Sequence, residues 1–72
     1  MSLTMGEKIR ILMRRKHMNL GQLAEATGQT RANLGNKLSR DNFKEQDLRK
    51  IAEALNCDFD AAFVMRDTGE RV

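Results

Sequence analysis

The sequence predicts a mainly α fold, in which a bundle of four short helices is followed by a C-terminal β-strand or short hairpin. A chain of 72 residues has room for one small domain. Apolar residues recur at helical spacing over residues 5–16, 20–27, 30–38 and 44–56. After residue 56 the apolar residues alternate instead. We therefore expect a helical domain over residues 4–56 and a strand or hairpin over residues 57–72.

The first helix is expected to begin at Thr4. Thr4 stands three residues before Glu7, which is the spacing of a capping box, where each side chain bonds the backbone N–H of the other residue. The apolar face that follows consists of Met5, Ile9, Leu12 and Met13. Basic residues up to Lys16 suit the negative end of the helix dipole, so the helix is expected to end there.

Two short helices should follow, separated by a turn at Gly28. Asn19 and Gln22 have the spacing of an N-cap residue and its partner. Gly28 ends that helix because glycine adopts the left-handed backbone conformation without steric cost. Thr30 can then cap the next helix. The buried positions of the two helices are expected to be Leu20, Leu23, Ala24, Leu34 and Leu38.

A polar loop is expected at residues 39–42, before the fourth helix. That helix has the most regular pattern in the chain, with apolar residues at positions i, i+3, i+4 and i+7. These residues are Leu48, Ile51, Ala52 and Leu55.

The last segment has two possible conformations. Every second residue from Cys57 to Met65 is apolar, which favours a strand, and residues 67–69 have the composition of a turn back into residues 70–72. The alternative is a fifth helix capped by Asp58, with Phe59, Ala62 and Phe63 facing inward. The alternation covers five positions and the helical pattern covers three, so a strand is the preferred prediction.

The two halves of the chain carry opposite charge. Residues 1–40 hold eight basic and two acidic side chains, whereas residues 41–72 hold five basic and eight acidic ones, within a net charge of +3. A basic half indicates a polyanionic partner, although a solvated helix surface would have the same composition.

The composition excludes several classes of function. The chain has one histidine, His17, and one cysteine, Cys57, so neither a catalytic nucleophile–base pair nor a set of paired metal ligands can be assembled. We therefore expect no enzyme, no cofactor and no metal. Charged residues interrupt every apolar run, which excludes a membrane-spanning segment. A single cysteine is typical of a reducing compartment, so a cytoplasmic location is expected.

Ala24, Gly28 and Leu34 have the spacing of a helix-turn-helix motif. A small residue lets two helices cross closely, glycine turns the chain, and leucine anchors the second helix. With residues 6–12, 23–31 and 48–55, this motif resembles the Cro/C1-type (Xre-like) helix-turn-helix family. The resemblance covers residues 5–56. It implies a lambda-repressor-like bundle that binds double-stranded DNA as a homodimer and acts as a transcriptional repressor in a bacterium or phage.

The resemblance also implies that a recognition helix at about residues 30–38 enters the major groove. The candidates for reading base edges are Gln29, Thr30, Arg31, Asn33 and Asn36. The candidates for phosphate contacts are Gln22, Lys37, Arg40, Asn42 and Lys44. The family usually has glutamine where this chain has Leu20, and often arginine where it has Met13, so no phosphate contact is assigned to these two residues.

The apolar tail is expected to mediate dimerisation. A terminal strand has an unpaired edge, which a second copy can cover across a two-fold axis. The expected dimer contacts are Ala61, Phe63, Val64 and Met65. A hairpin folded back on its own domain is the alternative. The competing functional hypothesis is an antitoxin or protein-interaction module with the same fold, for which DNA binding is secondary.

Overall fold

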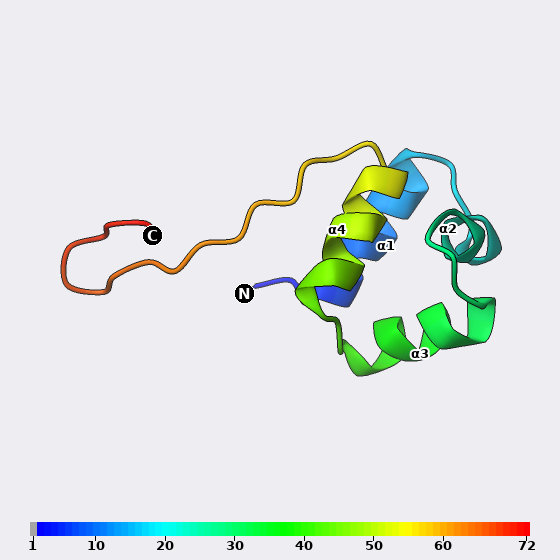
Figure 1. Ribbon diagram of the computed structural model, residues 1–72, viewed down its shortest axis with the longest axis horizontal. Helices are drawn as coiled ribbons and strands as arrows, with labels where there is room; N and C mark the ends of the chain where they lie inside the picture. Colours follow the sequence, from blue (N-terminus) through cyan, green and yellow to red (C-terminus); the bar gives the residue numbers. More distant parts are fainter. Residues whose placement is uncertain (1) are drawn as a thin grey trace.

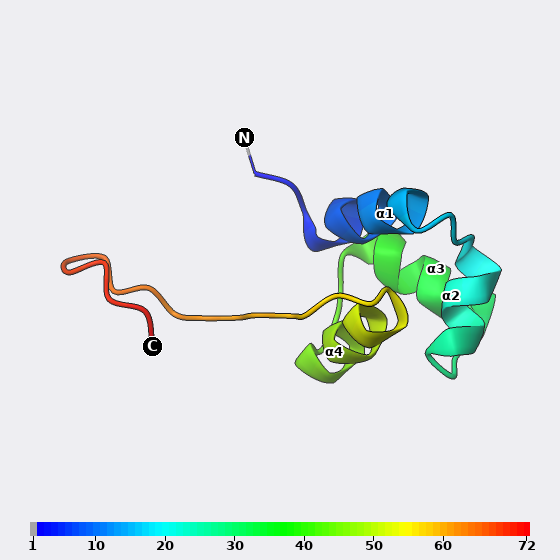
Figure 2. The same cartoon turned by 90° about the horizontal axis from the view of Figure 1, so that it is seen from above.

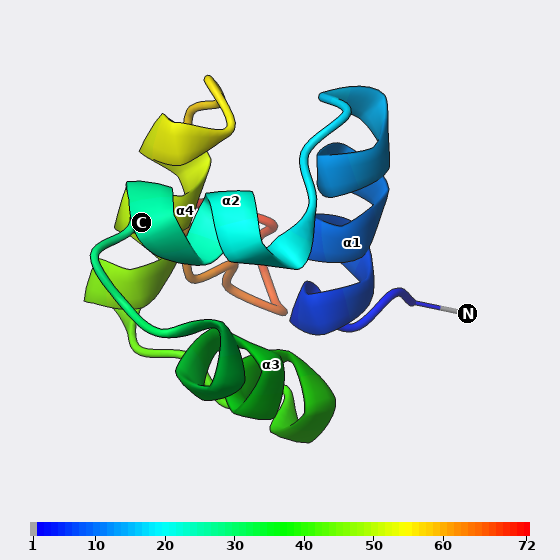
Figure 3. The same cartoon turned by 90° about the vertical axis from the view of Figure 1, so that its right-hand side faces the viewer.

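A computed structural model of the protein describes residues 2–72. These residues form four helices, α1 (Met5–Arg15), α2 (Leu20–Ala26), α3 (Arg31–Arg40) and α4 (Glu45–Ala54) (Figure 1). Helix α3 packs chiefly against α2 and α1. Figure 3 shows α2 lying across the space between α1 and α4, with α3 below it. The predicted four-helix bundle is confirmed.

The first three helices begin at the predicted capping residues. The Thr4 hydroxyl accepts a hydrogen bond from the Glu7 N–H at 3.1 Å, and the Glu7 carboxylate accepts one from the Thr4 N–H at 2.9 Å. Asn19 and Gln22 form the same reciprocal pair, with both distances 2.8 Å. Thr30 caps α3 by accepting from the Asn33 N–H. Each cap satisfies backbone donors that have no partner within the helix, and so defines where the helix begins.

One hydrophobic core joins the four helices. Its most deeply buried side chains are Leu23, Leu34 and Leu55, one each from α2, α3 and the end of α4. The other buried apolar residues are Ile9, Met13, Ala24, Leu38, Ile51 and Ala52. All nine belong to the predicted apolar faces, because burial on one side of each helix follows directly from its 3.6-residue period.

At Gly6, α1 approaches the end of α3 closely. A Cβ atom on Gly6 would lie 2.9 Å from the Leu38 carbonyl oxygen. The Gly6 N–H donates to Oδ1 of Asp41 at 2.6 Å, so Asp41 caps α1 from a distant part of the chain. This close contact between backbones requires glycine.

The loop predicted at residues 39–42 begins later than expected. Ser39 and Arg40 belong to α3, which ends when Asp41 takes the left-handed conformation at φ 52°. The Asp41 N–H donates to the Leu38 carbonyl, and the Asn42 N–H to the Lys37 carbonyl. These bonds satisfy the last turn of the helix, so no glycine is needed to end it.

The predicted strand over residues 57–65 and the alternative fifth helix do not form; of the predicted strand or short hairpin, only a minimal hairpin over residues 63–72 is present, with its turn close to the predicted position. Residues 57–62 have no regular secondary structure, and a single antiparallel bridge joins Val64 to Arg71. Phe63 and Val72 exchange two backbone hydrogen bonds beside it. Figures 1 and 2 show this tail leaving the helices and turning back on itself at its far end. Alternation alone makes no strand, because a strand needs a neighbour to bond and the helical domain offers none.

Candidate functional site

The turn between α2 and α3 is held by backbone geometry at Gly28. Gly28 has a φ of 71°, in the left-handed region. The Gln29 N–H then donates to the Ala24 carbonyl at 3.0 Å and closes the end of α2. With Thr30 capping α3 one residue later, the two helices are joined by a tight turn of the predicted kind.

Helix α3 presents one face to the core and the other to solvent. Leu34 and Leu38 are almost fully buried. The opposite face is exposed, and comprises Arg31, Ala32, Asn33, Asn36, Ser39 and Arg40. The tail runs away from this face (Figures 1 and 2). The side of α3 predicted to meet a partner is therefore open along its length.

A polar hollow of about 210 Å³ lies on the second half of this face. It is lined by five residues, Asn33, Asn36, Lys37, Arg40 and Asn42. All five are among the predicted contact residues, two as base readers and three as phosphate ligands. Its lining consists of three asparagines, one lysine and one arginine, and none of the lining side chains is acidic. Such a surface can donate several hydrogen bonds to anionic or carbonyl oxygens.

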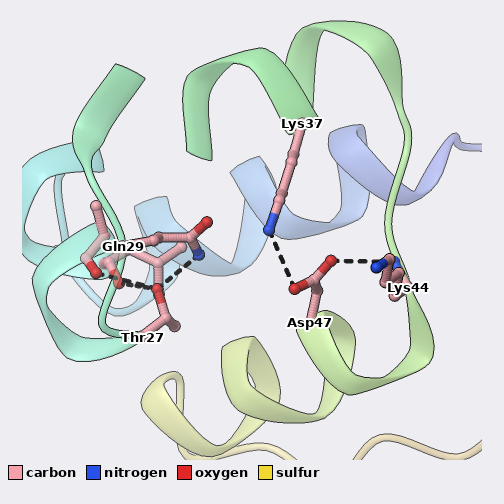
Figure 4. Close-up of polar contacts among 7 residues, drawn as sticks. Thr27, Gln29, Lys37, Lys44 and Asp47 are labelled. Atoms are coloured by element: carbon pink, nitrogen blue, oxygen red, sulfur yellow. Dashed lines mark hydrogen bonds and ion pairs between the residues drawn. The ribbon is translucent and has the colours of Figure 1, made fainter. Parts of the chain in front are cut away.

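Lys37 has a partner inside the protein (Figure 4). Its ammonium lies 3.1 Å from Oδ1 of Asp47 on α4, and the two side chains are 27% and 20% exposed. The other oxygen, Oδ2, accepts from the Lys44 backbone N–H at 3.1 Å. This N–H and then the Lys37 ammonium lower the pKa of Asp47 below its ordinary value of 3.8. Sequence spacing does not indicate this pair, because the two residues are ten apart and on different helices.

Gln29 turns toward the protein, unlike an exposed base-reading side chain. Its Nε2 donates to the Thr27 hydroxyl at 2.8 Å, and that hydroxyl donates to the Leu23 carbonyl at 2.9 Å (Figure 4). The Oε1 atom of Gln29 is buried and has no hydrogen-bond partner among the described residues. A buried oxygen without a donor destabilises this arrangement. Gln29 must therefore leave Thr27 before it can reach a ligand.

Gln22 and Thr30 combine capping with an outward position. Both residues are exposed. Oε1 of Gln22 accepts from the Asn19 N–H, so its Nε2 amide is the group left to donate to a ligand. The Thr30 oxygen accepts from the Asn33 N–H, and its hydroxyl proton remains able to donate.

The two positions to which no phosphate contact was assigned have structural roles. Met13 is buried in the core. Leu20 is partly buried, packs against the core and lies beside Gly35 of α3, where its Cδ2 is 3.6 Å from the place of a Cβ on Gly35. Leu20 thus makes an apolar contact between the start of α2 and the middle of α3.

The tail has its own internal contacts. Arg71 pairs with Asp60 at 2.9 Å and closes the terminal turn. The Arg49 guanidinium lies 5.8 Å from the Phe59 ring centre, which holds the beginning of the tail against α4. Beyond that point the predicted dimer residues, Ala61, Phe63, Val64 and Met65, are all exposed. Phe63 alone exposes 85% of its surface.

Residues 2–72 include no group of three or more histidine, cysteine, aspartate or glutamate side chains placed to hold a metal ion. In the same part of the chain, no helix has the length and apolar character required to cross a bilayer.

The model of a family described as "Cro/C1-type HTH DNA-binding domain" matches residues 8–68. No curated protein and no solved structure matches the chain.

Proposed function

The chain belongs to the Cro/C1-type helix-turn-helix DNA-binding domain family, and on that premise we propose that it is a sequence-specific repressor that binds operator DNA as a homodimer. Helix α3 is its recognition helix and lies in the major groove. DNA as the partner supports a cytoplasmic location, where a bacterial chromosome or phage genome is accessible.

The observation that supports this proposal best is the open face of α3. It exposes arginine and asparagine side chains along one side of a helix whose other side is anchored by Leu34 and Leu38. An α-helix fits the major groove of B-DNA, and these residue types match the donor and acceptor patterns of base edges there. Five predicted contact residues line one hollow that contains no acidic side chain, and this grouping is not expected of a helix face that contacts only solvent.

Base reading is assigned to the beginning and outer side of α3. Arg31 can donate two hydrogen bonds to O6 and N7 of guanine, and Asn33 or Asn36 can bond N6 and N7 of adenine. Thr30 reaches a base or a phosphate through its hydroxyl proton. Gln29 joins this group once it exchanges Thr27 for DNA, which also relieves its unpaired Oε1.

Phosphate binding is assigned to residues on both sides of the recognition helix. The set consists of Gln22, Lys37, Arg40, Asn42 and Lys44. Gln22 lies in the first turn of α2, while the others continue from the second half of α3 to the start of α4. Contacts on both sides of a groove set the orientation of the helix without reading sequence. They also make binding fall steeply with salt, because each neutralised phosphate releases counterions.

Dimerisation is assigned to the tail. Phe63, Val64, Met65 and Val72 are 85%, 58%, 47% and 77% exposed, an unusual cluster for so small a protein. Pairing with the same residues of a second copy would bury them and supply the edge partner that the tail lacks. A two-fold dimer would then present two recognition helices to successive major grooves, about 34 Å apart. Occupying such an operator would exclude other proteins from it, which is the basis of repression.

Selection of bound sites from a random duplex pool tests this proposal. A two-fold symmetric consensus with half-sites about one helical turn apart is expected. With that site in hand, Arg31→Ala should weaken specific binding by about 1–3 kcal/mol and relax the preference at one base pair. Arg10→Ala is the matched control, since Arg10 is an exposed arginine on α1 to which no DNA or dimer contact is assigned. Unchanged affinity and preference for Arg31→Ala would refute the recognition-helix assignment.

A protein-interaction module, such as an antitoxin, is the second candidate. The exposed apolar tail favours it, because a different protein could cover the same residues. Sedimentation of the pure chain separates the two functions. A dimer with DNA affinity supports the repressor, whereas a monomer that co-purifies with another protein at fixed stoichiometry supports the module.

A further inference from the structure

We propose that Asp47 is a specificity-determining residue, which makes the phosphate contact of Lys37 conditional on correct docking of the duplex. This inference rests on the proposed DNA-binding function and concerns the same face of the protein. It arises from the placement of one carboxylate beside a hollow that is otherwise polar and cationic.

The carboxylate of Asp47 is held in place independently of Lys37. Asp47 lies in the first turn of α4, and its Oδ2 accepts from the Lys44 backbone N–H at 3.1 Å. Oδ1 is left to face Lys37, whose ammonium is 3.1 Å away. Because the backbone of α4 anchors Asp47, the carboxylate cannot follow Lys37 toward a ligand.

The Lys37 side chain therefore lies between the hollow on α3 and the Asp47 carboxylate on α4. It lines the hollow on α3 with Asn36 and Arg40, and it also reaches across to α4 (Figure 4). Only 27% of the side chain is exposed, so the ion pair is shielded more than a surface pair would be. A phosphate can take the ammonium only by replacing Asp47 as its partner.

Within the described part of the chain, Arg40 lines the same hollow as Lys37 but is not held by an acidic side chain. It is exposed and forms no ion pair within residues 2–72. Its guanidinium can therefore meet any duplex, whereas the Lys37 ammonium must exchange one anion for another. That exchange is favourable only where base contacts hold a phosphate close to the hollow, so that the phosphate can compete with Asp47 for the Lys37 ammonium. Randomly placed DNA does not provide this, so Asp47 lowers non-specific affinity and raises the ratio of specific to non-specific binding.

The test compares the salt dependence of binding to a random duplex and to the selected operator, by fluorescence anisotropy of the full chain. Asp47→Asn keeps an oxygen for the Lys44 N–H and removes the charge that holds Lys37. It should steepen the salt slope on random duplex by about 0.9 per protomer, the value for one added phosphate contact, or about 1.8 for a bound dimer, and leave the operator slope unchanged. Between about 50 and about 200 mM salt this corresponds to an extra fall in affinity of about 3.5-fold for each protomer bound.

Glu45→Gln is the matched control. Glu45 also lies in the first turn of α4, but it pairs with the exposed Arg49 and not with Lys37. The control removes the same charge from the same helix end, and should leave both slopes unchanged. Adding Lys37→Gln to Asp47→Asn should return the random-duplex slope to that of the wild type.

Lys37→Gln in the wild-type background keeps the test decisive if Asp47→Asn fails to fold. It should reduce the operator slope by about 0.9 per protomer, or about 1.8 for the dimer, and leave the random-duplex slope unchanged. The inference would be overturned if Lys37→Gln reduced the salt slope equally on both duplexes. It would also be overturned if Glu45→Gln changed the random-duplex slope as Asp47→Asn does, or if the effect of Asp47→Asn persisted when Lys37→Gln was added. Absence of salt-dependent duplex binding by the wild type would instead refute the proposed function itself.

Discussion

Replacing Gly6 with alanine should destabilise the domain, even though alanine is the better helix former. The new Cβ would lie 2.9 Å from the Leu38 carbonyl oxygen, a backbone atom that cannot move aside without shifting α3. Overpacking of this kind costs about 1–3 kcal/mol. The shift also weakens the bond from the Gly6 N–H to the Asp41 carboxylate, and a bond of this charged type contributes about 1.5–3 kcal/mol. Helix propensity offsets at most about 1 kcal/mol. A net loss of about 2 kcal/mol should lower the Tm by roughly 10 °C.

Gly35→Ala is the matched control, because it makes the same chemical change in another helix of the same domain. Its Cβ would lie 3.6 Å from Cδ2 of Leu20, which is an ordinary contact distance. This variant should gain about 0.5–1 kcal/mol from helix propensity. Thermal and urea unfolding, followed by circular dichroism at one protein concentration, measure both changes. A Gly6→Ala variant as stable as the wild type would refute the close-contact argument.

Three further predictions concern the turn, the acid limb of stability and the tail. Thr27→Val should lower the free energy of unfolding by about 1–2 kcal/mol, because it removes the acceptor of Gln29 Nε2. Gln29→Met removes that donor together with the unpaired oxygen, so it should leave the stability measured by urea titration unchanged or increase it. Equal losses of stability in the two variants would contradict this account. Because the pKa of Asp47 is lowered in the folded state, the Asp47 carboxylate stabilises the fold above pH 3.8, and this contribution is lost as the pH falls through the folded-state pKa. Asp47→Asn should therefore make the midpoint of urea unfolding less dependent on pH in the acidic range. Deleting residues 60–72 should abolish self-association in sedimentation while the helical signal persists, since this segment is exposed throughout; a truncated chain that still dimerises would contradict the role of the tail.

Helix positions and the core followed from local pattern. Thr4, Asn19 and Thr30 cap the helices predicted for them, and the buried face of each helix contains the predicted residues. Capping and amphipathic spacing involve residues only a few positions apart, so a single sequence contains the information. Helix α3 continues two residues beyond the predicted end, through Ser39 and Arg40, because Asp41 adopts the left-handed conformation that closes the helix.

The tail shows where alternation misleads. Five alternating apolar residues are compatible with a strand, but strand formation depends on an available edge, and residues 57–62 lie against none. The candidate site was likewise predicted as a set of residues without its internal partners. Gln29 bonds Thr27, and Lys37 pairs with Asp47, through side-chain directions that spacing does not specify.

The sequence by itself determined the four helices, the caps of the first three, the turn at Gly28 and the family to which the chain belongs, because these depend on neighbouring residues and on periodicity. The tertiary structure alone decided which side chains are available to a ligand. It brings Lys37 to Asp47, Gly6 to Leu38 and the hollow on α3 to the surface, and it leaves the apolar side chains of the tail exposed. Such contacts depend on how separate helices are positioned relative to one another, and that positioning is set by the packing of the whole core.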